Sequence, residues 1–281
     1  MLRSHTGLLL IALASCAAPQ VLPLTAASPA AAPLIIAHRG ASAEAPENTL
    51  AAYALAIEQG ALLAECDIYL TADGVPVLFH DSDLERTTNG RGPIINFSLA
   101  HLKELDAGSW KNAAYAGETI PTLVEFLLAV KGKLRPVIEI KGKDREIESQ
   151  VIRALRQAQF PSEDVMIFSF HYQVVEKIAR LDPALPTTWL VTPPEAGEDA
   201  GPFFRRALEA RVSALGVSHD KLTPSFLRRA HESGLSLFVW TVNDAQRMVQ
   251  LANMGVDGVI TDRPALALEV LRGQATAGVQ P

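Results

Sequence analysis

The chain has 281 residues and a net charge of −6 at pH 7, and its 25 lysines and arginines are scattered along the sequence. This length suits a single sizeable core, because α/β barrels commonly run to ~250 residues as one domain. Scattered basic residues in an acidic chain argue against nucleic acid as a partner. We therefore expect the ligand to be a small molecule.

The first 33 residues are predicted to lie outside the fold. Residues 1–16 combine an early basic region with the apolar run "GLLLIALASC", which is typical of an export signal and too short to span a bilayer as a mature helix. Its end resembles the bacterial lipobox, which predicts cleavage before Cys16 and a lipid on that cysteine. The alternative is an ordinary signal cleaved later, within "PLTAASPAAAP". The Ala/Pro-rich residues 17–33 would serve as a tether.

These features predict an exported protein, either a lipoprotein anchored at the cell envelope or a periplasmic or secreted one. A membrane would then be contacted only through the lipid. The second cysteine, Cys66, lies in a strand-like run and is predicted to be a buried, inert thiol. With Cys16 lipidated or removed, no intramolecular disulfide can form.

From residue 34 onward, short apolar runs alternate with amphipathic segments. The strand candidates are "LIIAH", "LLAECDIYL", "VPVLFH", "RPVIEI", "VMIFSF", "TTWLV", "SALGVS", "LFVWTV" and "GVIT". Alternating strands and helices indicate a parallel sheet, and about eight such units favour a closed (β/α)8 TIM barrel. Nine candidates for eight places mean that one strand is surplus or lies outside the barrel.

Two stretches break the alternation. The second and third runs are joined only by "TADG", and an Asp73-Gly74 turn predicts a hairpin in which Asp67 lies opposite His80. The polar segment at about 82–118 is too long for an ordinary barrel loop. We expect this insertion after the third strand to form a cap at the carboxyl end of the barrel, where barrel enzymes bind their substrates.

Charged side chains stand at the carboxyl ends of the first four strands. Side chains two apart on a strand share a face, so Glu65 and Asp67 point together, as do Glu139 and Lys141. Together with these four, the residues expected at one barrel mouth are His38, Arg39 and His80. Each one alone is compatible with a paired core residue, but all seven in one half of a barrel favour a reaction site.

The chemistry of this set narrows the reaction. Three carboxylates form a hard-cation site suited to Ca²⁺ or Mg²⁺, whereas zinc would recruit histidines or the cysteine. The two histidines then remain free for proton transfer near neutral pH. Arg39 and Lys141 add two cations, which suit an anionic phosphoryl group. The residues therefore predict phosphodiester cleavage.

The motifs also carry a family resemblance. "HRG", "PENT", "T-x-D-G-V-P-V", "HD", "L-x-R-T-T-N-G-x-G", "IEIK", "VWTVN" and "GVDGVITDRP" occur in the order and spacing of the glycerophosphodiester phosphodiesterase family. The resemblance covers residues 34 to about 270 and implies a (β/α)8 barrel over 34–272, similar to that of the phosphatidylinositol phospholipases C. Residues 273–281 would form a flexible tail.

The resemblance implies metal-dependent hydrolysis of glycerophosphodiesters to glycerol 3-phosphate and an alcohol. Carried over by position, one divalent cation would be held by Glu65, Asp67 and Glu139, and His38 and His80 would form the acid/base pair. Arg39 and Lys141 would hold phosphate oxygens, and Trp240 would wall the glycerol pocket.

Other functions stay open on the sequence. A phospholipase D of the sphingomyelinase type has a similar barrel and a similar set of residues, although "PENT" and "LERTTNGRG" fit the glycerophosphodiesterases better. A lipoprotein that binds glycerophosphodiesters without cleaving them would be expected to have lost a histidine or a carboxylate. Where the family often has Asp, this chain has His171, predicted to begin a surface helix or to lie near the mouth. The sequence leaves open Ca²⁺ versus Mg²⁺, the preferred alcohol, the oligomeric state and which histidine is the acid.

Overall fold

The computed structural model describes residues 32–143, 146–194 and 199–277. The predicted signal, Cys16 and nearly all of the predicted tether lie outside these residues, as does the very end of the predicted tail. Every helix within the described ranges is too short or too polar to cross a membrane.

Eight parallel strands form a closed barrel, because the first strand pairs with both the second and the last. These strands are β1 (Leu34–Ala37), β2 (Leu63–Leu70), β4 (Arg135–Ile140), β5 (Met166–Ser169), β6 (Thr187–Val191), β7 (Ala214–Ser218), β8 (Ser236–Trp240) and β9 (Gly258–Thr261). The predicted TIM barrel is confirmed. The surplus candidate is β3 (Pro76–Leu78), which pairs antiparallel with β2 on the outside of the ring.

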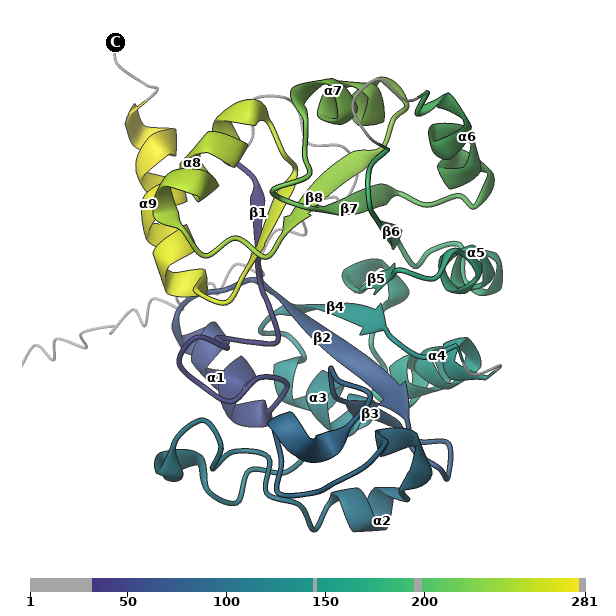
Figure 1. Ribbon diagram of the computed structural model, residues 1–281, viewed down its shortest axis with the longest axis vertical. Helices are drawn as coiled ribbons and strands as arrows, with labels where there is room; N and C mark the ends of the chain where they lie inside the picture. The colour runs from purple at the N-terminus through teal and green to yellow at the C-terminus, as the bar shows by residue number, and fades with distance from the viewer. Residues whose placement is uncertain (1–31, 144–145, 195–198, 278–281) are drawn as a thin grey trace, which may run out of the picture.

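Helices surround the strands (Figure 1). They are α1 (Leu50–Glu58), α3 (Leu123–Val130), α4 (Ile147–Gln157), α5 (Tyr172–Leu181), α6 (Gly201–Glu209), α7 (Pro224–Glu232), α8 (Ala245–Met254) and α9 (Pro264–Ala277). Local signals fix several starts: α3 begins with a capping box between Thr122 and Glu125. Since α9 continues to Ala277, the predicted tail is helical over its first residues rather than flexible from residue 273.

The barrel interior changes from apolar to charged along β2 and β4. Its apolar filling consists of Ile36, Leu63, Val137, Met166, Phe168, Leu190, Ala214, Phe238 and Ile260. Residues two further along a strand share the same face, so Glu65 follows Leu63 and Glu139 follows Val137 into the interior. The charged side chains therefore gather at the carboxyl end, above a packed apolar floor. Cys66 faces the other way and is fully buried, as predicted.

The β2–β3 hairpin corrects one prediction. Phe79, rather than His80, lies opposite Asp67, and its backbone N–H donates to the Asp67 carbonyl at 2.9 Å. The reason is the turn, which closes between Thr71 and Val75 and so contains three residues instead of two. Gly74 supplies the left-handed conformation (φ 78°) that such a loop requires.

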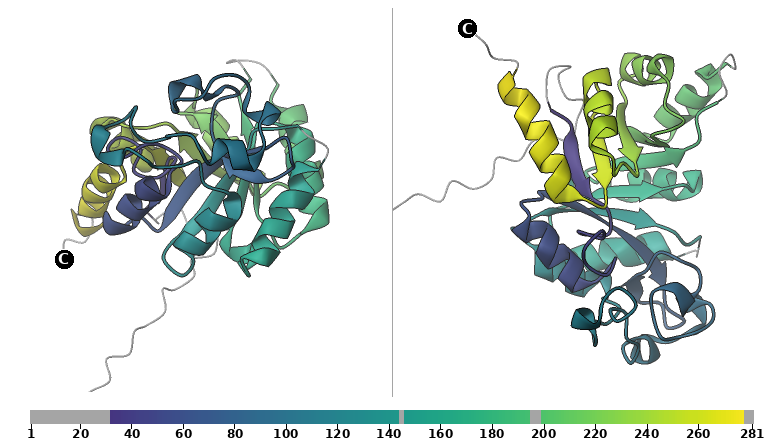
Figure 2. Two further views of the ribbon diagram at one scale, coloured as in Figure 1. Left: turned by 90° about the horizontal axis from the view of Figure 1, so that it is seen from below. Right: turned by 60° about the vertical axis from the view of Figure 1, so that its left-hand side comes forward.

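Between β3 and α3 the chain forms a cap with its own small core. Its elements are η1 (Leu84–Arg86), η2 (Ile94–Asn96), α2 (Leu99–Leu102) and η3 (Ala113–Tyr115). Leu84, Ile94 and Leu102 are fully buried together and pack with Val77 and Phe79 of the hairpin. Figures 1 and 2 show this segment in blue and teal on the β2 side of the barrel, away from α6 and α7.

Candidate active site

The turn after β1 places the first two site residues. His38 follows the strand directly, and Arg39 and Gly40 both adopt left-handed backbone conformations (φ 56° and 85°). A side chain on Gly40 would place its Cβ 2.6 Å from the carbonyl carbon of Ala52 in α1, so glycine is required there. The turn also directs the Arg39 backbone N–H to Glu65 Oε2 at 3.1 Å.

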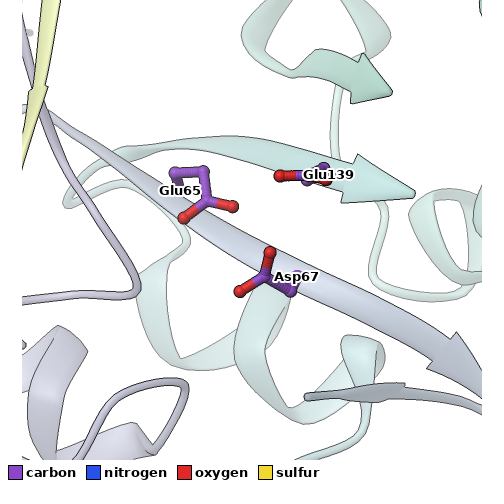
Figure 3. Close-up of side chains that lie close together, drawn as sticks. All are labelled: Glu65, Asp67 and Glu139. Carbon is purple, nitrogen blue, oxygen red and sulfur yellow. The ribbon is translucent and has the colours of Figure 1, made fainter. Parts of the chain in front are cut away.

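Three buried carboxylates converge from two strands. The parallel register of β2 and β4 places Asp67 directly beside Glu139, and Glu65 lies two residues earlier on the same face of β2. One oxygen from each of the three lies within 4.8 Å of the others. Figure 3 shows the three carboxyl groups pointing toward a common centre.

The close approach of these three buried carboxyl groups favours binding of a cation. Burial, with Asp67 nearby, raises the pKa of Glu65 well above its usual range and that of Glu139 to about 7. Burial alone would also raise the pKa of Asp67, but Arg39 and Lys141 lower it to about 2. Glu65 Oε1 is buried and accepts no hydrogen bond from the described residues. An all-oxygen set with such an unpartnered atom fits a hard divalent cation.

Two cations border the carboxylates. Arg39 Nε lies 3.1 Å from Asp67 Oδ2, and Lys141 Nζ lies 3.2 Å from Asp67 Oδ1 and 2.9 Å from Glu139 Oε1. Burial by itself lowers the pKa of Lys141, but the adjacent Asp67 and Glu139 hold it above its usual range. Both side chains therefore stay charged beside the carboxylates.

Each histidine is oriented by an aspartate. His38 Nδ1 lies 2.6 Å from Asp262 Oδ1, and His80 Nδ1 lies 2.6 Å from Asp81 Oδ1. A carboxylate accepts a hydrogen bond, so in each pair Nδ1 carries the proton and Nε2 is the nitrogen free to act. Burial lowers the pKa of His80, and Arg39 lowers it further.

A pocket of about 120 Å³ unites these groups. Its charged and polar lining includes His38, Arg39, Glu65, His80, Glu139 and Lys141, and its apolar lining includes Phe168, Phe170, Leu190, Trp240 and Ile260. The site residues predicted from the sequence between positions 38 and 240 are therefore all brought together. All of them line this pocket except Asp67, which contacts Arg39 and Lys141 beside it.

A wider groove of about 420 Å³ adjoins the pocket. The two cavities share His80, Glu139, Lys141 and Phe170, and the groove continues over Tyr69, Asp81, Ser82, Ile140 and His171. His171 lines this groove at the mouth and is also the residue that caps the start of α5. Both of the positions predicted for it as alternatives are therefore found together. The smaller pocket and the wider groove therefore meet at these four shared residues.

Comparison with known proteins identifies the family. The model of the glycerophosphoryl diester phosphodiesterase family matches residues 38–266. The chain belongs to this family. It is 36% identical to the glycerophosphodiester phosphodiesterase of Caldanaerobacter subterraneus subsp. tengcongensis over 85% of this chain and 98% of that protein. For the glycerophosphodiester phosphodiesterase of Bacillus subtilis the identity is 35%, covering 85% of this chain and 87% of the relative.

A solved structure supports the same assignment. An Oleispira antarctica phosphodiesterase, in complex with its product sn-glycerol-3-phosphate, superposes with a TM-score of 0.79 at 32% identity. The match covers 86% of this chain and 97% of that one. Homologues and structural neighbours of the chain are thus named as phosphodiesterases of this family.

Several supporting residues of this family member carried no role in the sequence analysis. Asn48 of "PENT" donates from Nδ2 to Asp67 Oδ2 at 2.9 Å and accepts the Asp67 N–H at 3.2 Å. Asn243 of "VWTVN" donates to Asp262 of "TDRP" at 2.6 Å. Glu47 and Arg86 form ion pairs at the rim. All five residues lie within the motifs quoted from the sequence, but the motifs do not indicate which residue each one contacts. The folded structure shows these contacts.

Proposed function

We propose that this protein hydrolyses glycerophosphodiesters to glycerol 3-phosphate and an alcohol, with a divalent metal and with His38 and His80 as the acid/base pair. The observation that carries the proposal is the convergence of two aspartate-held histidines, two cations and three buried carboxylates on one pocket. Such a set suits an anionic diester, which needs charge neutralisation and proton transfer at both the entering and the leaving oxygen.

The metal would be held by Glu65, Asp67 and Glu139, whose oxygens suit a hard cation such as Ca²⁺ or Mg²⁺. When bound, a divalent cation polarises phosphoryl oxygens and offsets the charge that develops on them. The family is divalent-metal-dependent, which agrees with this cluster. Arg39 and Lys141, which already face the carboxylates, would bind phosphate oxygens that lie on the same centre.

The two cavities suggest how the substrate lies. The glycerol that remains on the phosphate would occupy the smaller pocket, against Trp240, Leu190 and Ile260. The departing alcohol would extend into the groove beside Tyr69 and Phe170, which leaves room for alcohols of different sizes. This orientation places the scissile bond where the cavities meet.

The same orientation distinguishes the histidines. His38 lines only the smaller pocket, so its free Nε2 would accept the proton of the attacking oxygen. His80 lines both cavities, so, when its Nε2 is also protonated, it would donate that proton to the departing alcohol. Asp262 and Asp81 would hold the two rings in these roles, because each fixes the proton on Nδ1.

The direct test is release of glycerol 3-phosphate from glycerophosphocholine, with and without EDTA. We expect turnover by the wild-type protein, loss of turnover in EDTA, and recovery on adding Ca²⁺ or Mg²⁺. The variants His38→Ala and His80→Ala should be inactive while retaining the wild-type melting temperature within a few degrees. Tight binding of glycerophosphocholine without turnover would instead favour a binding lipoprotein, and cleavage of sphingomyelin in its place would favour the phospholipase D alternative.

We also propose that the protein is exported and carries lipid on Cys16. The proposal rests on the apolar run that ends in "LASC", a segment outside the described residues. Cys16→Ser should abolish labelling by a radioactive fatty acid in a bacterial host and leave a soluble or unprocessed precursor. An unchanged membrane fraction would favour an ordinary signal or an uncleaved anchor.

A further inference from the structure

Four charged side chains and His80 form a continuous series of contacts from the cap to the reaction site. Arg86 of η1 donates from Nη1 and Nη2 to the two oxygens of Glu47 at 2.8 and 2.7 Å. Glu47 Oε1 in turn accepts from Arg39 Nη1 at 2.7 Å. On its other edge, Arg86 donates from Nε and Nη2 to the two oxygens of Asp81 at 2.6 and 3.0 Å. Asp81 is the residue that orients His80.

Arginine is suited to this position by its shape. A guanidinium presents five N–H donors in one rigid plane, so Arg86 can form two-point contacts with two carboxylates at once. A lysine would keep the positive charge but offers a single compact ammonium, which cannot span both partners in the same way. The arrangement therefore depends on geometry as well as charge.

The backbone that carries Arg86 is anchored independently. Leu84 in the same turn is fully buried in the cap core, and the side chain of Thr88 donates to the Leu84 carbonyl at 2.7 Å. The Leu84 N–H also donates to the Gly92 carbonyl at 3.1 Å. The "LERTTNGRG" segment thus holds the start of the Arg86 side chain in place without help from the ion pairs.

Stability alone does not account for the chain of charges. The Arg86 side chain is 45% exposed, and exposed ion pairs typically contribute only about 0 to 1 kcal/mol. Its partners, by contrast, lead directly to His80 and Arg39, which the proposed function places on the departing alcohol and on the phosphate. The hydrogen bonds from Arg86 also lower the pKa of Asp81 to about 2.

We propose that Arg86 is a positioning residue that holds His80 through Asp81 and Arg39 through Glu47, and so aligns both with the phosphodiester. This inference rests on the proposed function. Arg86 has two arms of contacts, one through Glu47 to Arg39 and one through Asp81 to His80. Because these arms end on different groups, they should affect different kinetic constants. The Glu47 arm should act mainly on KM through the phosphate contact of Arg39, and the Asp81 arm mainly on kcat through His80.

The test compares Arg86→Gln and Arg86→Lys with Arg91→Gln, a matched loss of charge at an exposed position in the same cap segment. We expect Arg86→Gln to lower kcat/KM about 10²-fold, with both constants affected, since small misplacements of reacting groups carry losses of this size. Arg86→Lys should still lose roughly tenfold, and Arg91→Gln should match the wild type. In an Asp81→Asn background, the further loss caused by Arg86→Gln should appear in KM alone.

Several results would overturn the inference. Kinetic constants of Arg86→Gln equal to those of Arg91→Gln would do so, as would fully additive kcat losses in the Asp81→Asn background. If Arg86→Gln does not fold, the decision rests on Arg86→Lys, and wild-type constants for that variant would refute a geometric role. An inactive wild-type protein in the same assay would contradict the proposed function itself, whereas an active wild type with unaffected Arg86 variants contradicts only this inference.

Discussion

Asp262 and His38 lie 224 residues apart in the sequence, yet Asp262 Oδ1 is 2.6 Å from His38 Nδ1. Pairing of β1 with β9 brings them together, because each residue directly follows its strand. Asp262 is itself fixed by Ser42, which donates to Oδ1 at 3.0 Å, and by Asn243, which donates to Oδ2 at 2.6 Å. The carboxylate is therefore held by hydrogen bonds from three residues.

Asp262→Asn should lower kcat by about 10²-fold or more while changing KM little. An asparagine can donate to Nδ1 as well as accept from it, so the His38 ring is no longer held with its proton on Nδ1. Steady-state kinetics on glycerophosphocholine would measure the loss, and the melting temperature would show that the fold is retained.

The chain offers a matched control for this variant at the opposite end of the barrel. Asp257 Oδ2 pairs with His231 Nε2 at 2.8 Å and accepts the Leu237 N–H at 2.7 Å. Asp257 directly precedes β9, whereas Asp262 directly follows it. Asp257→Asn should reduce stability but leave kcat within about twofold of the wild type. Equal kcat losses for the two variants would refute a specific role for Asp262.

Acid should weaken the contribution of Asp262 to stability. Burial on its own raises the pKa of this carboxyl, but hydrogen bonds from His38, Asn243 and Ser42 lower it to about 2. The unfolded carboxyl titrates near ~3.9. A lowered folded pKa means that the stabilisation is complete above the unfolded pKa and disappears as the pH falls toward 2. The difference in unfolding free energy between wild type and Asp262→Asn should shrink by roughly 1 kcal/mol between pH 5 and pH 3.

Urea titrations at the two pH values would measure this difference. Asp257→Asn serves again as the comparison, because it removes a buried carboxylate that is not part of the His38 pair. A gap between wild type and Asp262→Asn that widens on acidification would contradict the expected sign.

The sequence predicted the carboxylate cluster because its members follow a strictly local rule. Glu65 and Asp67 are two residues apart, as are Glu139 and Lys141, and a strand places such pairs on one face whatever the rest of the chain does. Parallel strands then bring their carboxyl ends to one rim, so the convergence follows from the fold class.

Contacts that depend on side chains far apart in the sequence could not be predicted in this way. Glu47 and Arg86 are 39 residues apart on two irregular segments, and no periodicity relates them. The hairpin register was wrong for a similar reason. A turn containing Asp73-Gly74 can hold two or three residues, and that choice moves every partner of Asp67 by one position.

Metal removal should abolish activity and lower the melting temperature, since a cation that binds only the folded state stabilises it. Glu65→Gln and Asp67→Asn should weaken Ca²⁺ or Mg²⁺ binding by roughly tenfold or more, measured by calorimetry, because each removes a charged oxygen ligand. Glu148→Gln in α4 is the control, as it neutralises a buried carboxylate outside the cluster. Full activity of folded Glu65→Gln in EDTA would exclude a metal at this site.

The route of cleavage gives the last prediction. If the retained glycerol occupies the smaller pocket as proposed, its 2-hydroxyl, covalently tethered beside the phosphorus, would lie on the side of His38. We expect this hydroxyl, rather than water, to attack first and give a cyclic phosphate, since well-oriented intramolecular reactions reach effective concentrations of ~10⁵ M or more. Water would then open the ring, with the two histidines exchanging roles.

Replacing the 2-hydroxyl of the substrate by hydrogen should therefore leave binding nearly unchanged but slow turnover by about 10²-fold or more, the scale of losing one interaction made in the transition state. Phosphorus NMR during turnover of the normal substrate should show the cyclic ester as a transient species. Phosphomonoesters should be poor substrates, because they have no alcohol to depart into the groove beside Phe170. Near-normal turnover of the 2-deoxy diester would exclude internal attack and leave direct hydrolysis, with His38 taking the proton from water instead.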